Sequence, residues 1–321
     1  MSTDTCSGVQ NPEMKPWPSL APFGKFLPMP GGDLFYYDSE RDADSEGNAG
    51  NNSSAKKTLV LVHGLGDEAD TWRHVFRSFA DAGFRVIAPD LPGFGRSLWK
   101  GRINMRCHFD AVIRLLAVTG AASAENPAAL AGSSLGAGIV TGVAGMRPDL
   151  VKEIVLIGGC FPITGGLGAG FAFLALPFLG KAWYRGFRKN HEGAWKSLYP
   201  YYGDLDAMDQ ADRDFLRGRV IARVESPGQE RGFFSTLRSV IAFFTFGRRA
   251  AARKIRAFPG KIFILWGELD QIFPLDKAGL FRRLRPEAEL ALIAGAGHLP
   301  HQERPGETAV QILRFLQEGK V

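Results

Sequence analysis

Short runs of consecutive apolar residues recur along the chain and alternate with segments whose apolar residues follow helical spacing. Runs without polar interruption are typical of strands that are buried on both faces of a sheet. Six of them predict parallel strands, at 58–62, 85–88, 128–131, 151–157, 261–265 and 288–293. Helical spacing recurs between them, at 68–82, 105–118, 135–144 and 305–317. This alternation predicts a doubly wound α/β fold with helices on both faces of the sheet.

The beginning of the chain follows a different pattern. Residues 1–24 contain scattered prolines without periodicity, which predicts a loose N-terminal tail. Residues 25–28 and 34–38 read as two short strands joined by a Gly-Gly-Asp turn. Residues 39–57 are rich in Gly, Asn, Asp and Ser and cannot bury a core, so a disordered loop is expected there.

A long segment without strand signals separates the run at 151–157 from the run at 261–265. It is too long for a plain connection within a compact domain. Residues 160–259 are rich in aromatic side chains, and helical periodicity recurs at 215–224 and 233–244. We therefore expect a helical cap at 160–259, above the carboxyl edge of a core formed by 25–159 and 260–321.

Composition places the chain among ordinary globular proteins, since 45% of its 321 residues are hydrophobic and 22% are charged. Its three cysteines form neither a disulfide pattern nor a zinc pattern. The first residues are polar and lack the features of a secretory signal, so a cytoplasmic location is expected. The uncharged stretch at 154–180 is broken by prolines, and its continuous apolar part is too short to cross a bilayer.

The net charge of +6 is unevenly distributed. Residues 181–260 carry 16 Lys and Arg against 8 Asp and Glu. One interpretation is a solvated helical surface, and the other is a basic cap that contacts anionic lipid peripherally or approaches an acidic substrate. The basic-aromatic motifs of nucleic-acid-binding modules do not occur, so no nucleic-acid partner is expected.

The candidate chemistry gathers at the carboxyl ends of the predicted strands, where open parallel sheets form their active sites. Gly-Ser-Ser-Leu-Gly at 132–136 fits G-x-S-x-G, a sharp turn that exposes its central residue, Ser134. The run at 261–265 leads to Asp270, and the run at 288–293 leads to His298. A serine hydroxyl needs a base, and the base needs an orienting carboxylate. We predict Ser134 as nucleophile, His298 as base and Asp270 as the orienting acid.

The tetrahedral intermediate of such a reaction needs two preorganised N–H donors for its oxyanion. The backbone N–H groups of Leu65, in the glycine-rich turn after the first buried strand, and of Leu135 are the candidates. Several neighbours compete for these roles. They are His63, Ser133 and His301, for which a supporting or packing role is expected, and Glu268, which is a rival to Asp270 as the acid. Asp90 is expected to order its own loop.

These motifs together resemble the α/β-hydrolase superfamily across residues 25–320, because the order Ser134, Asp270, His298 is the order of that fold. The resemblance rests on the motifs at 63–66, 90–97, 132–136, 266–270 and 297–298. It implies an eight-stranded, mostly parallel sheet with a cap inserted after the sixth strand. It also favours Asp270 over Glu268 as the acid and requires neither a metal nor an organic cofactor.

A serine at the turn, rather than the aspartate of related epoxide hydrolases and dehalogenases, favours acyl transfer to water. We expect an esterase or lipase that acts on small lipophilic acyl or aryl esters. A lactonase, a C–C bond hydrolase or a cofactor-free haloperoxidase could use the same residues. A ligand receptor or a lipid-surface protein with weak hydrolase activity is the alternative from another class. The oligomeric state stays open.

Overall fold

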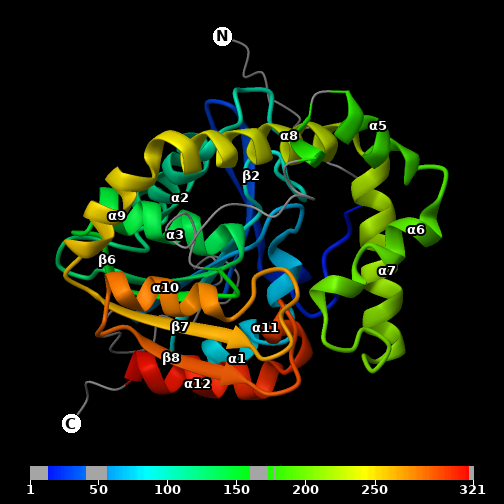
Figure 1. The fold of residues 1–321 in the computed structure, drawn as a ribbon. Coiled ribbons are helices and arrows are strands. Elements are labelled where there is room, and N and C mark those ends of the chain that lie inside the picture. The colour runs from blue at the N-terminus through cyan, green and yellow to red at the C-terminus, as the bar shows by residue number, and fades with distance from the viewer. Residues whose placement is uncertain (1–13, 41–55, 160–172, 177, 318–321) are drawn as a thin grey trace, which may run out of the picture.

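The computed structural model describes residues 14–40, 56–159, 173–176 and 178–317, and its centre is one eight-stranded sheet (Figure 1). The strand order is β1-β2-β4-β3-β5-β6-β7-β8. The strands are β1 (Gly24–Met29), β2 (Gly32–Asp38), β3 (Thr58–Val62), β4 (Arg85–Pro89), β5 (Ala128–Ser133), β6 (Val151–Ile157), β7 (Lys261–Gly267) and β8 (Glu289–Ile293). Strand β2 pairs antiparallel with β1 and β4, and the other neighbours pair in parallel. The predicted fold class is confirmed.

Helices cover both faces of the sheet, because neighbouring residues of a buried strand point to opposite sides. In β3, Val60 belongs to the core cluster under α2 (Met105–Val118), α3 (Leu135–Met146) and α10 (Asp276–Leu284). The next residue, Leu61, belongs to the cluster under α1 (Phe76–Asp81) and α12 (Pro305–Gln317). The continuous apolar run at 58–62 thus reflects burial on two sides.

The segment between β6 and β7 is helical over its described residues. It contains α5 (Leu179–Gly186), α6 (His191–Lys196), α7 (Gln210–Glu225), α8 (Pro227–Ala242), the π-helical turn η4 (Phe243–Gly247) and α9 (Arg248–Arg256). Helices α8 and α9 pack against the core helices, since Val240 and Ile255 join the cluster of α2 and α3. Figure 1 shows α5, α6 and α7 standing to one side of this layer. Only part of the predicted cap therefore lies apart from the core.

The single helix predicted at 68–82 is wrong in detail. A short 3-10 turn, η2 (Ala69–Trp72), precedes α1, and the two do not join. Between them the backbone makes tighter turns, in which the N–H groups of Arg73 and Val75 donate to the carbonyl oxygens of Asp70 and Trp72. The side chain of Asp70 is fully buried and accepts hydrogen bonds from the backbone N–H of Trp17 and from the hydroxyl of Tyr37, both at 2.7 Å.

The N-terminal prediction also needs correction over residues 14–24. Met14 is 2% exposed and Leu20 is fully buried, so this part packs on the core instead of forming a loose tail. Residues 1–13 and most of the predicted disordered loop at 39–57 lie outside the described residues. None of the described helices is both long enough and apolar enough to span a membrane.

Candidate active site

Ser134 stands at a strained turn between β5 and α3. Its backbone has φ 52° and ψ −114°, a conformation that residues with a side chain rarely adopt. The flanking glycines make the turn possible, because a Cβ on Gly132 would overlap the backbone of Gly136. A Cβ on Gly136 would in turn overlap the carbonyl oxygen of Val62 at the end of β3. The G-x-S-x-G pattern is thus explained by close contact between strand and helix.

Asp270 and His298 are in contact, although they come from the loops after β7 and β8. Nδ1 of His298 lies 2.8 Å from Oδ2 of Asp270, and both side chains are 1% exposed. Oδ1 of Asp270 accepts the backbone N–H groups of Ile272 (2.8 Å) and Phe273 (2.9 Å). The carboxylate is therefore held by its own loop, and its second oxygen is presented to the imidazole.

Ser134 and His298 line the same cavity, of about 200 Å³. Among the described residues, Nε2 of His298 has no hydrogen-bond partner although it is buried. The two glycines after β6 contact both residues: a Cβ on Gly159 would lie 3.1 Å from Cα of Ser134, and one on Gly158 would lie 3.1 Å from Nδ1 of His298. Ser134 and His298 therefore pack against the same short segment.

The glycine-rich turn after β3 adjoins Ser134. A Cβ on Gly64 would lie 3.3 Å from Cβ of Ser134, and Leu65 lines the cavity. His63 supports the turn, because Nε2 accepts the N–H of Leu91 (2.8 Å) while Nδ1 lies 2.8 Å from the carbonyl oxygen of Gly64. This arrangement suits a neutral imidazole, and burial lowers the pKa of His63 accordingly. His63 holds the turn and does not face the cavity.

The second predicted oxyanion donor, Leu135, is the first residue of α3. The first N–H groups of a helix have no acceptor within it. The positive end of the helix dipole adds to their attraction for an anion. The N–H groups of Leu65 and Leu135 thus come from two turns that adjoin Ser134, one on each side.

The competing residues lie elsewhere. Glu268 accepts the N–H of Gly295 at 3.2 Å, in the neighbouring loop. His301 bonds to Thr71 at 2.9 Å, and burial lowers its pKa to about 3. Ser133 is buried, and Asp90 binds Arg96 in its own loop and the N–H of Ala69 in η2. None of these four residues lines the cavity that Ser134 and His298 share.

The cavity wall is mostly apolar. Its described lining comes from the glycine-rich turn, the serine turn, Leu174, helices α5, α7 and α8, residues 197–202 and the segment after β8. The apolar and aromatic side chains are Leu65, Leu174, Trp183, Tyr184, Phe187, Leu198, Tyr201, Tyr202, Leu216, Val220, Val224, Phe233 and Leu299. The ring of Tyr201 lies 5.7 Å from the imidazole of His298. The backbone carbonyl oxygen of Tyr201 accepts the backbone N–H of His298 at 2.8 Å.

Arg223 is the one Lys or Arg among the described lining residues, and its charge is already matched. It reaches from α7 to Asp67 at 2.5 Å and to Glu68 at 2.8 Å, directly after the glycine-rich turn. Burial would raise the pKa of Asp67, but Arg223 together with His63 and the hydrogen bonds to the carboxylate keeps this pKa below its ordinary value. Helix α7 is thereby tied to the turn by two partly buried ion pairs.

Sequence reasoning missed this ion-pair group and the contact of Tyr201. Arg223 lies 155 residues from Glu68 in the chain, and no local pattern connects them. Tyr201 looked like one more packing aromatic. Within the described residues, no group of three or more His, Cys, Asp or Glu side chains is arranged to hold a metal ion.

The chain belongs to the α/β-hydrolase fold family, whose model matches residues 57–305. A curated relative is the 2-hydroxy-6-oxononadienedioate/2-hydroxy-6-oxononatrienedioate hydrolase of Paraburkholderia phymatum, 28% identical over 82% of this chain and 88% of the relative. Lipase 1 of Psychrobacter immobilis is 26% identical over 81% of this chain and 77% of its own. These similarities support a hydrolase that acts on small molecules.

Solved structures share the fold at lower identity. Cfl2 of Burkholderia cenocepacia superposes with a TM-score of 0.74 at 23% identity, covering 94% of this chain and 99% of Cfl2. Carboxylesterase CesB of Bacillus subtilis superposes with a TM-score of 0.69 at 18% identity, covering 92% of each chain. At such identities the likeness establishes the architecture alone.

Proposed function

We propose that this protein is a serine hydrolase that cleaves lipophilic carboxylic esters through an acyl-enzyme. The observation that carries the proposal is the pairing of a strained, cavity-lining Ser134 with a buried His298 that is bound to Asp270 through Nδ1 and unoccupied at Nε2. A hydroxyl, an imidazole and a carboxylate in this order are what nucleophilic acyl transfer needs.

In the proposed reaction, Nε2 of His298 takes the proton of Ser134 as Oγ attacks the ester carbonyl. Asp270 keeps the other imidazole proton on Nδ1 and stabilises the imidazolium that forms. The N–H groups of Leu65 and Leu135 stabilise the oxyanion, where one such donor is worth about 3 kcal/mol. His298 then protonates the departing alcohol, and a water activated by the same nitrogen releases the acid.

The cavity favours a neutral substrate. Arg223, the one cation on the described wall, is engaged by Asp67 and Glu68, so a substrate carboxylate would have to displace one of them. The aromatic side chains of α5 and the apolar side chains of α7 offer a surface for an acyl or aryl group.

Hydrolysis of a C–C bond is the second candidate, because several curated relatives are named as hydrolases of dienoate-type substrates. In that case Arg223 would have to turn from Asp67 to the substrate carboxylate. The ester proposal predicts instead that Arg223 stays with its carboxylates throughout turnover.

A substrate panel tests the proposal. Wild type should hydrolyse p-nitrophenyl esters of short and medium acids, while Ser134→Ala should lose more than about 10⁴-fold in kcat. Ser133→Ala is the matched control, because Ser133 is buried and does not line the cavity. Higher kcat/KM on a 2-hydroxy-6-oxo-dienoate than on every ester, with Arg223→Met losing that activity selectively, would favour C–C cleavage. Equal ester turnover by wild type and Ser134→Ala would refute both candidates.

A further inference from the structure

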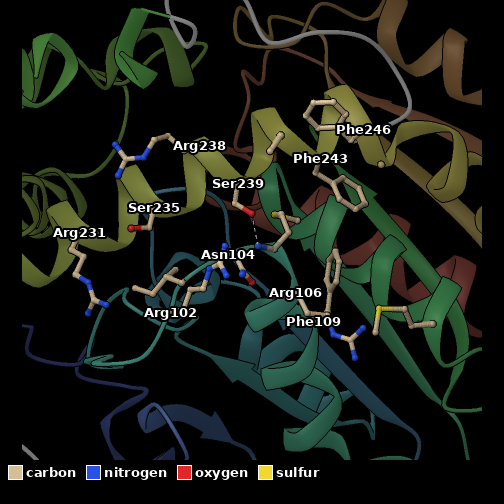
Figure 2. Close-up of a pocket in the computed structure, with 15 residues that line it drawn as sticks. Arg102, Asn104, Arg106, Phe109, Arg231, Ser235, Arg238, Ser239, Phe243 and Phe246 are labelled. Atoms are coloured by element: carbon tan, nitrogen blue, oxygen red, sulfur yellow. Dashed lines mark hydrogen bonds between the residues drawn. The ribbon is translucent and has the colours of Figure 1, made fainter. Parts of the chain in front are cut away.

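A second and larger recess, of about 900 Å³, lies away from Ser134 (Figure 2). One wall is α8 with η4, and the other is the beginning of α2 with the residues before it. The two walls are joined where the N–H of Met105 donates to Oγ of Ser239 at 2.8 Å. The inner surface is more apolar than polar, with Asn104, Ser235 and Ser239 beside the rings of Phe109 and Phe243, which meet edge to face at 6.1 Å.

Arginines stand around this recess. Figure 2 shows Arg231 and Arg238 on α8 opposite Arg102 and Arg106. Arg106 is paired with Asp110 at 2.8 Å, and Arg231 donates to the carbonyl oxygens of three residues, at 99–101. In the described part of the chain, Arg102 and Arg238 have no carboxylate partner. The recess thus has an apolar floor and a positive rim.

The positive charge continues beyond the recess. Residues 231–256 contain seven Lys or Arg and no Asp or Glu, and we call this stretch of α8, η4 and α9 the basic ridge. The five basic residues of α9 are exposed, and no carboxylate among the described residues pairs with them. They are Arg248, Arg249, Arg253, Lys254 and Arg256. Core packing accounts only for the opposite face of α9, where Ile255 is buried.

One aromatic side chain protrudes from this charged surface. Phe246, in the π-helical turn that joins α8 to α9, is 87% exposed. Phe246 is also one of the residues that line the recess, and Figure 2 shows its ring apart from those of Phe109 and Phe243. Nothing in the packing of the described residues explains a phenylalanine in water between two basic helices. An apolar ring flanked by cations is the combination that suits a membrane–water interface.

We propose that the basic ridge docks on an anionic lipid surface, with Phe246 inserted among the headgroups and the recess receiving one of them. The charges of the ridge complement anionic phospholipid, to which each Lys or Arg near the surface adds attraction. A soluble polyanion such as DNA would satisfy the arginines and leave Phe246 in water, so lipid accounts for more of the surface. The proposal does not depend on the chemistry of Ser134.

Vesicle co-sedimentation tests it. The full chain should bind phosphatidylcholine vesicles that contain phosphatidylglycerol and not pure phosphatidylcholine vesicles. Binding should disappear near 1 M salt, where the Debye length is only about 3 Å. The triple variant Arg248→Glu, Arg249→Glu and Arg253→Glu should bind at least about 100-fold more weakly. Phe246→Ser should bind about tenfold more weakly, because the ring no longer leaves water.

The matched control reverses three exposed charges that likewise have no carboxylate partner among the described residues, Lys15, Arg77 and Lys189. They lie in the N-terminal segment, on α1 and before α6, and both of these helices lie away from α9 in Figure 1. This triple variant has the same net charge and should bind like wild type. Circular dichroism and turnover of a soluble ester, both unchanged, would show that each variant is folded. Three results would overturn the proposal. They are equally weak vesicle binding by the control variant, equal binding of wild type to anionic and neutral vesicles, and binding of Phe246→Ser as tight as that of wild type. Tight binding to duplex DNA that displaces the vesicles, independent of Phe246, would assign the ridge to a nucleic acid instead.

Discussion

Asp270→Asn is the most informative single substitution, because the surrounding loop dictates how the introduced asparagine would be oriented. The N–H groups of Ile272 and Phe273 both point at Oδ1 of Asp270. They require an acceptor there, so the amide oxygen of the asparagine would take that place and its NH₂ would face His298. An amide NH₂ can only donate. Nδ1 of His298 would then have to accept, and the imidazole proton would move to Nε2.

A proton on Nε2 removes the lone pair that is proposed to receive the proton of Ser134. In serine proteases, the same Asp→Asn change puts the catalytic histidine in the wrong tautomer and lowers kcat about 10⁴-fold. This factor corresponds to about 5 kcal/mol of activation free energy. We expect a similar loss in kcat on p-nitrophenyl esters with little change in KM. Glu268→Gln is the control, since that carboxylate bonds to Gly295 and not to His298. A kcat for Asp270→Asn within tenfold of wild type would refute the reasoning.

Three further predictions concern stability, each measured as the free energy of unfolding in urea. Gly136→Ala should lower the free energy of unfolding by more than about 3 kcal/mol, because the new Cβ would overlap the backbone of β3. Gly279→Ala, at an open helical position, should raise it by about 1 kcal/mol. Similar free energies of unfolding for the two variants would contradict the argument from close contact. Arg223→Met should cost about 3 kcal/mol because it leaves the partly buried Asp67 without its cation and Glu68 with Arg219 alone, and a loss under 1 kcal/mol would sink this expectation. Burial lowers the pKa of His108 and of His301 to about 3, so between about pH 6.5 and 3 the unfolded chain binds protons that the folded chain refuses. Stability should fall with acidification by up to about 2.7 kcal/mol per pH unit from these two groups, and a double His→Gln variant with an unchanged slope between pH 6 and 5 would contradict this.

The sheet could be predicted because its strands are buried on both faces and appear as unbroken apolar runs. The run at 58–62 became β3 and the run at 151–157 became β6, with the same bounds. Helix α2 also has the predicted bounds, since an amphipathic pattern begins directly after Asn104, whose side chain caps it through the N–H of Cys107. Local information was sufficient for these elements.

Elements shaped by distant partners could not be predicted. Asp70, in the segment expected to be one helix at 68–82, is instead enclosed by Trp17, Tyr37 and the arginines of other segments, such as Arg96. The residue pattern at 215–224 indicated a helix. It did not indicate that Arg223 would bind two carboxylates of the core. A buried charge looks like a surface charge until its partner is known.

The candidate site was more predictable than its cavity. Ser134, Asp270 and His298 stand in glycine-marked turns at strand ends, and the topology of a parallel sheet brings such turns to one edge. The wall above them depends on how α5 and α7 lie over the sheet, which residue patterns do not encode. The apolar surface near Phe233 and the matched charge of Arg223 therefore came from the structure.

The measurement that tests the central proposal most directly is covalent labelling with a fluorophosphonate, mapped by mass spectrometry. This reagent is attacked by an activated serine and leaves a phosphonyl group on its Oγ. We predict one phosphonyl group per chain on Ser134, lost in Ser134→Ala and retained in Ser133→Ala. A label on any other residue, or undiminished labelling of Ser134→Ala, would contradict the assignment of Ser134 as the nucleophile.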